Sequence, residues 1–270
     1  MNYKIISMDF DGTLLTSNKK VTDKNKEALL NYKKNNYIIV GITARNISSV
    51  NNVCDISMFN YLILNNGAYI YDVENKEIIN ISNIDKDVAI NITKYFEDAA
   101  YQIDYCSLNN YYTYKNNNIN NKSFLKRVNS VEEVEEIIVR MNIFLKDNSE
   151  IDKYKNYLEK HFKNLDFFEM SDTDNKNNKK WLVLISKGTN KLETLKILCS
   201  KLRISINEVV FFGDSSNDLL IIGKVGLGVA MGNALEEVKN QAKEITLSND
   251  EDGIAYFLKK IIWKQKFLSW

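Results

Sequence analysis

Five short apolar runs set the strongest limit on how this chain can fold. They occupy residues 5–8, 37–42, 61–64, 209–212 and 227–230. Strands that are apolar along their whole length are typical of parallel sheets, because helices cover both faces of such a sheet. Residues 22–35, between the first two runs, have their apolar side chains at helical spacing. The pattern therefore predicts an α/β fold with a parallel sheet.

Polar or glycine-rich residues follow four of these runs, where each strand is expected to end. They are Asp9 with Asp11, residues 43–45, residues 65–67 and residues 213–218. In open parallel sheets, ligands bind outside the carboxyl ends of the strands. Four strands would therefore direct polar groups to one edge of one sheet, which favours a functional site over four unrelated turns.

Asp9 and Asp11 place two carboxylates close together, and Gly12 lets the backbone turn directly after them. Close carboxylates repel each other, so the pair is tolerable where a cation is shared or where one acid keeps its proton. A strand that ends in an ordinary Asp/Gly turn would give the same residues. The polar residues after the other strands favour the chemical interpretation.

Length and composition exclude several classes of function. A chain of 270 residues that is 44% hydrophobic can bury one large core or two smaller ones. A formal net charge of +1 gives no electrostatic footprint for nucleic acid. No apolar run approaches the roughly 20 residues that span a bilayer. The three cysteines are widely spaced and lack CxxC spacing, so we expect neither disulfides nor a zinc site, and a cytoplasmic location.

Four motifs of the chain resemble those of the haloacid dehalogenase superfamily. They are Asp9-x-Asp11-Gly12-Thr13-Leu14, Thr43, Lys191, and Gly213-Asp214-x-x-Asn217-Asp218. Residues 228–234 and 248–255 resemble the Cof-type subfamily of small-molecule phosphatases, whose cap is of class IIB. The first and fourth motifs are specific, and the order and spacing of the set make it strong. The resemblance implies a Rossmann-like core with an inserted α/β cap domain.

Two motifs depart from the pattern of the family. The second usually reads Thr-Gly-Arg and here reads Thr43-Ala44-Arg45, so the backbone after the threonine is less free to approach a phosphate. The residue after the motif lysine is usually glycine and here is Leu192. These differences leave the chemistry intact but weaken the transfer of a substrate preference from better-matched relatives.

The chemistry of a phosphate monoester assigns roles to the two acids of the first motif. The ester is negatively charged and repels nucleophiles, so positive charge is needed around the phosphoryl oxygens. Asp9 is the natural nucleophile, forming an aspartyl-phosphate that divides hydrolysis into two easier steps. Asp11 would serve as general acid to the leaving alkoxide and then as general base to water. These roles ask Asp11 to hold a proton that Asp9 lacks.

A hard cation with oxygen ligands fits the acid cluster, and Mg²⁺ suits it. We assign Asp9 and Asp214 as side-chain ligands, and the resemblance adds the backbone carbonyl of Asp11. The resemblance places Asp218 in the neighbouring shell, where it could instead orient Lys191, and the sequence leaves both roles open.

By resemblance, further residues bind the phosphate or the rest of the substrate. Thr43, Ala44, Lys191 and Asn217 are the expected phosphate-binding residues, and Arg45 and Asn66 are expected on the substrate side. A helical lysine is usually solvated, and Lys187 lies nearby. The pattern of the family, which puts its lysine three residues after a glycine, here Gly188, selects Lys191.

The segment of residues 83–186 contains none of the motif residues. Its periodicity predicts helices at residues 88–96, 131–141 and 151–162 and strands at residues 143–145 and 181–185. The second helix would present its glutamates, among them Glu136, to solvent. The segment resembles the inserted cap, so we expect a catalytic core of residues 1–82 and 187–270 and a cap of residues 83–186. Such a cap excludes water and contacts the leaving group.

The resemblance implies a Mg²⁺-dependent phosphatase whose partner is a small-molecule phosphate monoester, first of all a sugar phosphate. A sugar phosphomutase is the alternative among enzymes. A noncatalytic phospho-ligand sensor is the alternative from another class; loss of Asp9 or Asp11 would mark it, and both are present. We expect a monomer or weak homo-oligomer without a membrane span. The basic aromatic tail of residues 257–270 predicts a terminal helix that docks Ile261, Ile262 and Trp263 on the core.

Overall fold

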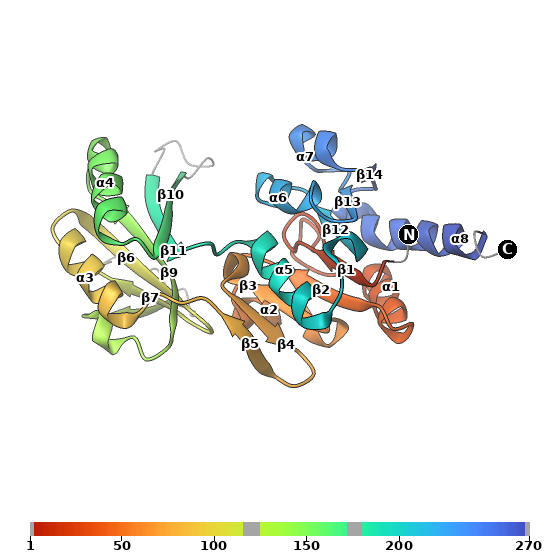
Figure 1. Cartoon of the computed structure of the whole chain (residues 1–270), viewed down its shortest axis with the longest axis horizontal. Helices are drawn as coiled ribbons and strands as arrows, with labels where there is room; N and C mark the ends of the chain where they lie inside the picture. Colours follow the sequence, from red (N-terminus) through yellow and green to blue (C-terminus); the bar gives the residue numbers. More distant parts are fainter. Residues whose placement is uncertain (1–2, 116–124, 172–179, 268–270) are drawn as a thin grey trace. The chain divides into compact units, whose positions relative to one another are not determined.

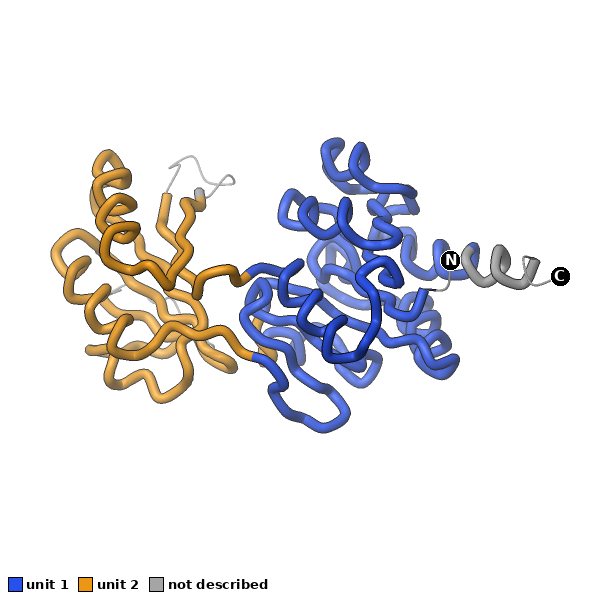
Figure 2. Tube along the Cα trace, viewed as in Figure 1, with its two compact units in different colours: residues 1–45, 49–80, 190–270 blue, residues 46–48, 81–189 orange. Residues whose placement is uncertain are grey.

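The protein divides into two compact units, which Figure 2 shows in blue and orange. The structure is a computed structural model that describes residues 3–115, 125–171 and 180–267, without the side chains of residues 171 and 261–267. Unit 1 comprises residues 1–45, 49–80 and 190–270, and unit 2 comprises residues 46–48 and 81–189. The chain therefore leaves unit 1, builds almost all of unit 2 and returns.

Unit 1 is built on an eight-stranded sheet in the order β14-β13-β12-β1-β2-β3-β4-β5 (Figure 1). Its strands are β1 (Ile5–Met8), β2 (Ile38–Ile42), β3 (Tyr61–Leu64), β4 (Tyr69–Asp72), β5 (Glu77–Ile81), β12 (Val209–Gly213), β13 (Leu227–Ala230) and β14 (Glu244–Ile245). From β14 to β3 every neighbouring pair is parallel, and β3 and β4 are antiparallel. The predicted parallel sheet is thus confirmed, with antiparallel strand pairing added near one edge.

Helices cover the central strands of this sheet, which explains why those strands are apolar throughout. The helices are α1 (Asp23–Lys34), α2 (Ile47–Asn51, shared with unit 2), α5 (Lys191–Leu202), α6 (Leu219–Ile222), α7 (Glu236–Gln241) and α8 (Gly253–Phe267). Helix α1 packs on β2, α5 on β3 and β4, and α6 on β12 and β13. Every residue of β1 is buried as a result. The Thr22 hydroxyl accepts a hydrogen bond from the Asn25 amide and begins α1 as an N-cap.

Unit 2 is built on a six-stranded sheet in the order β10-β11-β9-β6-β7-β8. Its strands are β6 (Ala100–Ser107), β7 (Tyr111–Tyr114), β8 (Leu125–Val128), β9 (Ile138–Leu145), β10 (Leu165–Ser171) and β11 (Lys180–Ser186), and its helices are α3 (Lys86–Phe96) and α4 (Ile151–His161). Apolar side chains from β6, β9 and β11 form one core with Ile92 of α3 and Leu158 of α4. The alternate positions of β6 and β9 carry polar residues, among them Asp104 and Arg140. The period of two explains why these strands lack continuous apolar runs.

Short 3-10 helices fill several connections. They are η1 (Ile56–Met58), η2 (Asn65–Gly67), η3 (Val131–Glu133), η4 (Asn148–Glu150), η5 (Ile206–Glu208), η6 (Ser216–Asp218) and η7 (Asn249–Glu251). Two of them, η2 and η6, follow the carboxyl ends of β3 and β12. They therefore carry two of the polar segments that the sequence singled out.

The helix predicted at residues 131–141 is wrong. Only η3 forms there, and β9 begins at Ile138 and pairs with both β6 and β11. The β-branched residues at 137–139 favour a strand once two neighbouring strands are available. Glu136 does not lie on a solvated helix face, because its carboxylate accepts hydrogen bonds from the Asn109 amide at 2.8 Å and from the Tyr112 hydroxyl at 3.3 Å.

Helix α8 follows the last strand of unit 1 and packs on α1. The Tyr32 hydroxyl of α1 donates to the Leu258 carbonyl at 2.6 Å. The predicted contacts of Ile261, Ile262 and Trp263 lie outside the described side chains. In the part of the chain that the structure describes, no helix combines the length and apolar character needed to cross a membrane.

Candidate active site

Unit 1 brings three of the predicted acids together at the carboxyl ends of its strands. Asp9 directly follows β1, Asp214 directly follows β12, and Asp218 closes η6. One carboxylate oxygen from each of the three lies within 4.8 Å of the others. Because β1 and β12 are parallel neighbours in register, the sheet itself fixes the separation of Asp9 and Asp214. The predicted convergence of strand ends is therefore present in the structure.

Lys191 neutralises part of this cluster. Its Nζ donates to Asp9 Oδ1 at 2.6 Å and to Asp218 Oδ1 at 3.0 Å. The side chains of all three residues are less than a tenth exposed. Although burial lowers the pKa of Lys191, the two carboxylates raise it further, so the lysine stays charged. The Asn190 side chain caps α5 by accepting from the Glu193 amide, which fixes the position of Lys191.

The contacts of Asp218 favour an orienting role over a metal-ligand role. Its Oδ1 accepts from Lys191, and its Oδ2 accepts from the backbone amides of Asp214 at 3.1 Å and Ser215 at 3.2 Å. Both oxygens are thus engaged. Asp218 holds the loop after β12 in shape while it positions the amine of Lys191.

Asp214 lies against the backbone turn after the first motif. The Thr13 hydroxyl donates to Asp214 Oδ1 at 2.6 Å. Gly12 adopts a φ of +83°, and a Cβ added there would lie 2.2 Å from Asp214 Oδ2. Both the conformation and the space therefore require glycine at this position.

Asp11 is held by two cations. Arg45 donates from Nε to Oδ2 at 2.7 Å and from Nη2 to Oδ1 at 2.8 Å, and Lys19 Nζ donates to Oδ1 at 2.8 Å. Sequence reasoning placed Arg45 on the substrate side and missed Lys19. No motif marks Lys19, which is one of two adjacent lysines in a polar loop.

The pKa order of the two acids is the reverse of the one expected from the sequence. The hydrogen bonds from Arg45, aided by Lys19, lower the pKa of Asp11 to about 2. Burial raises the pKa of Asp9 above its ordinary range, in spite of the opposing effect of Lys191. In this arrangement the contacts with Arg45 and Lys19 therefore favour the ionised form of Asp11. The reason is local, because the two cations that contact Asp11 could not be inferred from the motif.

The donor set fits a hard divalent cation. Among the described residues, Asp9 Oδ2 and Asp214 Oδ2 accept no hydrogen bond, while the other oxygen of each acid is engaged. Burial raises the pKa of Asp214, in spite of the opposing hydrogen bond from Thr13. Carboxylate oxygens without donors, on two neighbouring acids that are buried or half-buried, are suitable ligands for Mg²⁺.

The remaining predicted residues lie around this cluster with different degrees of engagement. Thr43 is buried after β2, and its hydroxyl accepts from the Arg45 amide at 3.2 Å. The Thr43 carbonyl accepts from the amide of Asn66, which has a left-handed φ of 59°. Ala44 is exposed, and Asn217 is exposed in η6. The loops that follow β2 and β3 are thus hydrogen-bonded to each other. Among the described contacts, none connects the Asn217 side chain to these loops.

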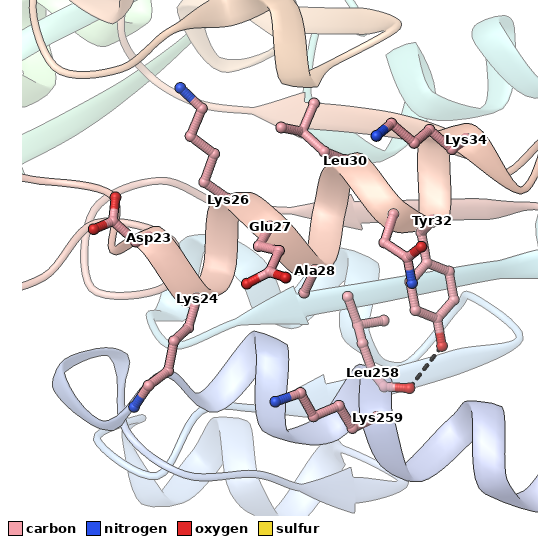
Figure 3. A pocket seen from close by; sticks show the side chains of 11 residues that line it. Asp23, Lys24, Lys26, Glu27, Ala28, Leu30, Tyr32, Lys34, Leu258 and Lys259 are labelled. Carbon is pink, nitrogen blue, oxygen red and sulfur yellow. Dashed lines mark hydrogen bonds between the residues drawn. The ribbon is translucent and has the colours of Figure 1, made fainter.

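A groove of about 530 Å³ between α1 and the start of α8 is separate from this cluster. Figure 3 shows its lining, in which the Tyr32 hydroxyl donates to the Leu258 carbonyl between the two helices. Lysines of both helices and two acids of α1 make up much of the rest of the lining. No residue of the acid cluster lines it.

Comparison with known proteins gives consistent matches over most of the chain. Residues 6–258 match the model of the family described as haloacid dehalogenase-like hydrolase. The stress response protein YhaX of Bacillus subtilis is 28% identical, covering 98% of this chain and 96% of the relative. Phosphatase YwpJ of Bacillus subtilis is 29% identical, covering 96% of this chain and all of the relative. The solved structure of the HAD subclass IIB sugar phosphatase BT4131 is similar in fold, with a TM-score of 0.71, 23% identity, and coverage of 96% of this chain and 98% of that one.

Proposed function

The chain belongs to the haloacid dehalogenase-like hydrolases, and on that premise we propose that it is a phosphatase of the Cof type that hydrolyses a sugar phosphate through an aspartyl-phosphate on Asp9. One observation carries the proposal. Asp9 is buried at a strand end with the amine of Lys191 at 2.6 Å and with Asp214 and Asp218 beside it. A buried acid in this setting is a suitable nucleophile, because the neighbouring ammonium offsets the charge of an arriving phosphoryl group.

Each described side chain has a distinct role in this proposal. Asp9 attacks phosphorus, and Lys191 stays charged to stabilise the phosphoryl oxygens. Asp218 keeps that lysine in place. The Thr43 hydroxyl lies at the end of the neighbouring strand, and this position supports the proposal that it binds the phosphate. Asn217 and Ala44 stay proposed phosphate-binding residues on resemblance.

Asp11 exchanges protons with the leaving group and then with water. It starts ionised, because Arg45 and Lys19 contact it. A guanidinium binds a phosphate in the same bidentate way as a carboxylate. We therefore propose that Arg45 leaves Asp11 and binds the substrate phosphate when the substrate enters. Asp11 is then free to take up a proton. Asn66 stays a proposed substrate-side residue.

A divalent metal would be held by Asp9 and Asp214, together with the backbone carbonyl of Asp11, and we propose Mg²⁺. When bound, it supplies positive charge to the phosphoryl oxygens and offsets the repulsion among the acids. The two carboxylate oxygens without hydrogen-bond donors support this assignment.

A sugar phosphate is proposed because residues 228–234 and 248–255 follow the Cof-type pattern. We also propose that residues 83–186, which lie within unit 2, act as a cap that selects the substrate. Three free cysteines support a reducing, cytoplasmic location. We further propose a monomer or weak homo-oligomer, which sedimentation would measure directly.

Release of inorganic phosphate from a panel of sugar, nucleotide and cofactor monoesters tests the function. We expect the highest kcat/KM for a sugar phosphate, complete loss of activity after exhaustive chelation, and recovery on addition of Mg²⁺. An isomeric sugar phosphate formed without phosphate release would establish a phosphomutase instead. A panel with no turnover at any metal concentration would reject the proposed enzyme.

A further inference from the structure

A short loop after the first motif returns a second lysine to the general acid. Residues 16–20 close on themselves, with the Thr16 amide donating to the Lys20 carbonyl at 2.9 Å and the Lys19 amide donating to the Thr16 carbonyl at 2.8 Å. Lys19 adopts a left-handed φ of 58°. That conformation carries a steric cost for a residue with a Cβ, so it persists only where the surroundings enforce it. Its result is the contact of 2.8 Å between Lys19 Nζ and Asp11 Oδ1.

Residues from the far end of the chain hold this loop in place. Ser17 donates to Asp250 from its amide at 2.8 Å and from its hydroxyl at 2.6 Å. The Asn249 side chain donates to the Leu15 carbonyl at 2.9 Å. These contacts span more than 230 residues of sequence and lie within unit 1. Asn249 and Asp250 belong to the motif of residues 248–255, which contributes no residue to the acid cluster. These contacts give that motif a structural role.

The same motif also reaches the turn that carries Gly12. The Asn233 side chain donates to the Gly12 carbonyl at 2.8 Å and accepts from the Asn249 amide at 3.0 Å. The loop with Lys19 and the turn after Asp11 are therefore fixed by one connected set of bonds. The position of Lys19 relative to Asp11 follows from both attachments.

The two cations on Asp11 are not equivalent. Arg45 contacts both carboxylate oxygens, whereas Lys19 contacts only Oδ1. When Arg45 moves to a substrate phosphate, Oδ1 keeps the Lys19 amine and Oδ2 loses its only donor among the described residues. One oxygen of Asp11 would then be restrained while the other is free to carry the proton.

We propose that Lys19 is a positioning residue for Asp11: it holds Oδ1 so that Oδ2 exchanges the proton with the leaving group. This inference rests on the proposed function. As the ester P–O bond breaks, its electron pair goes to the alkoxide oxygen, and the proton on Asp11 Oδ2 moves to that oxygen. In the second half-reaction the attacking water returns a proton to Oδ2. Lys19 stays protonated throughout and touches neither substrate nor phosphorus.

A comparison of two leaving groups tests this role. Glucose 6-phosphate releases a poor leaving group that needs a proton, whereas p-nitrophenyl phosphate releases a stable phenolate that does not. Because kcat/KM covers only the steps up to departure of the leaving group, it isolates the action of Asp11 as an acid. We expect Lys19→Met to lower kcat/KM for glucose 6-phosphate by about 10- to 100-fold and to change that for p-nitrophenyl phosphate by less than about threefold. Lys19→Arg should restore most of the loss.

Two further variants separate positioning from charge and from folding. Lys20→Met removes the same charge from the same loop, but the Lys20 amine has no partner among the described residues, so we expect both substrates to be unaffected. Asp250→Ala releases the loop while keeping Lys19, and we expect a smaller loss confined to glucose 6-phosphate. Circular dichroism would establish that each variant is folded.

Each other result has a defined meaning. Equal losses on both substrates for Lys19→Met, or equal effects of Lys19→Met and Lys20→Met, would show electrostatic steering or general damage and would overturn the positioning role. Wild-type enzyme that turns over neither substrate nor any other monoester would overturn the proposed function itself, and this role with it. If the wild-type enzyme hydrolyses p-nitrophenyl phosphate and another monoester but not glucose 6-phosphate, that other monoester replaces glucose 6-phosphate in the test. Lys19→Met must then lower kcat/KM for that monoester and not for p-nitrophenyl phosphate.

Discussion

The two units of this molecule use buried polar groups in different ways. In unit 1, Lys191 and Asp9 are 182 residues apart in sequence and form a buried ion pair. In unit 2, the buried polar contact between Thr93 and Tyr105 joins residues 12 apart, and both are uncharged. Charges are expensive to bury, whereas a hydroxyl pair is cheap. The buried charges of unit 1 belong to the proposed catalytic site, whereas the hydroxyl pair of unit 2 stabilises its core.

The largest expected difference in activity is between a variant of Asp9 in unit 1 and a matched variant in unit 2. We expect Asp9→Asn to lower kcat by about 10⁴-fold or more, because the amide is no nucleophile, while the fold is kept. Phosphate release and circular dichroism measure the two effects. Asp152→Asn, at an exposed position of α4 in unit 2, is the matched control and should leave both unchanged. Phosphate release by Asp9→Asn near the wild-type rate would contradict the nucleophile assignment.

Two glycines with positive φ provide the second test, one in each unit. A Cβ at Gly12 would meet Asp214 Oδ2 at 2.2 Å, whereas a Cβ at Gly188 would meet nothing within 4 Å. We expect Gly12→Ala to lower kcat/KM by about 100-fold, since small displacements of catalytic groups have effects of that size. Gly188→Ala should cost about 1 kcal/mol of stability from its conformation alone and leave the rate within a few fold. Similar rates for the two variants would contradict the importance of the Gly12 contact.

The core of unit 2 should respond as a body of its own. Leu158 is fully buried between α4 and the sheet, and Leu158→Ala should lower the free energy of unfolding by about 2–5 kcal/mol. Hydrogen exchange should then rise mainly in residues 81–189. Leu29→Ala, which is equally buried in unit 1, should raise exchange in the other set of residues. Uniform acceleration along the whole chain in both variants would argue against two units that open separately.

The smallest effect is expected at Glu136, the residue that the sequence placed on a helix. Although burial raises its pKa, the donors from Asn109, Asn110 and Tyr112 lower it by more. A lowered pKa means that the stabilisation is complete above the ordinary glutamate value of about 4.3 and is lost as the pH falls through the lower value of the folded state.

Glu136→Gln should therefore reduce the free energy of unfolding by about 1 kcal/mol at pH 7. The difference from wild type should shrink below about pH 4. Urea unfolding across this range measures it. A difference that grows with acidity would show that the charge of Glu136 destabilises the fold.

Unit 1 was largely predictable from the sequence, whereas in unit 2 the prediction of both helices and of β11 was confirmed but that of residues 131–141 was wrong, for a physical reason. A parallel strand that is covered on both faces appears as a continuous apolar run, and its site residues follow it directly, as Asp9 follows β1. Strands β6 and β9 of unit 2 alternate, and residues 131, 134, 138 and 141 satisfy helical spacing by coincidence. Pairing of β9 with β6 and β11 then decides the structure, and no local pattern contains that information.

Within the site, the sequence identified the acids and Lys191. It did not predict that Arg45 and Lys19 contact Asp11, or that these contacts lower the pKa of Asp11. Motifs specify which residues are near one another, whereas a pKa depends on which donors face each oxygen. Lys19 reaches Asp11 only because a loop folds back and is tied to Asp250. Such contacts depend on residues more than 200 positions away.

The position of β1 between β2 and β12 has a consequence for the making of the protein. Thr13 and Asp214 are 201 residues apart, and at a synthesis rate of about 5–20 residues per second the ribosome needs roughly 10–40 s to cover that interval. During that time the nascent chain carries Asp9, the proposed nucleophile, without Asp214, and for most of it also without Lys191. Under the proposed mechanism, the active site is therefore complete only after Asp214 has been synthesised.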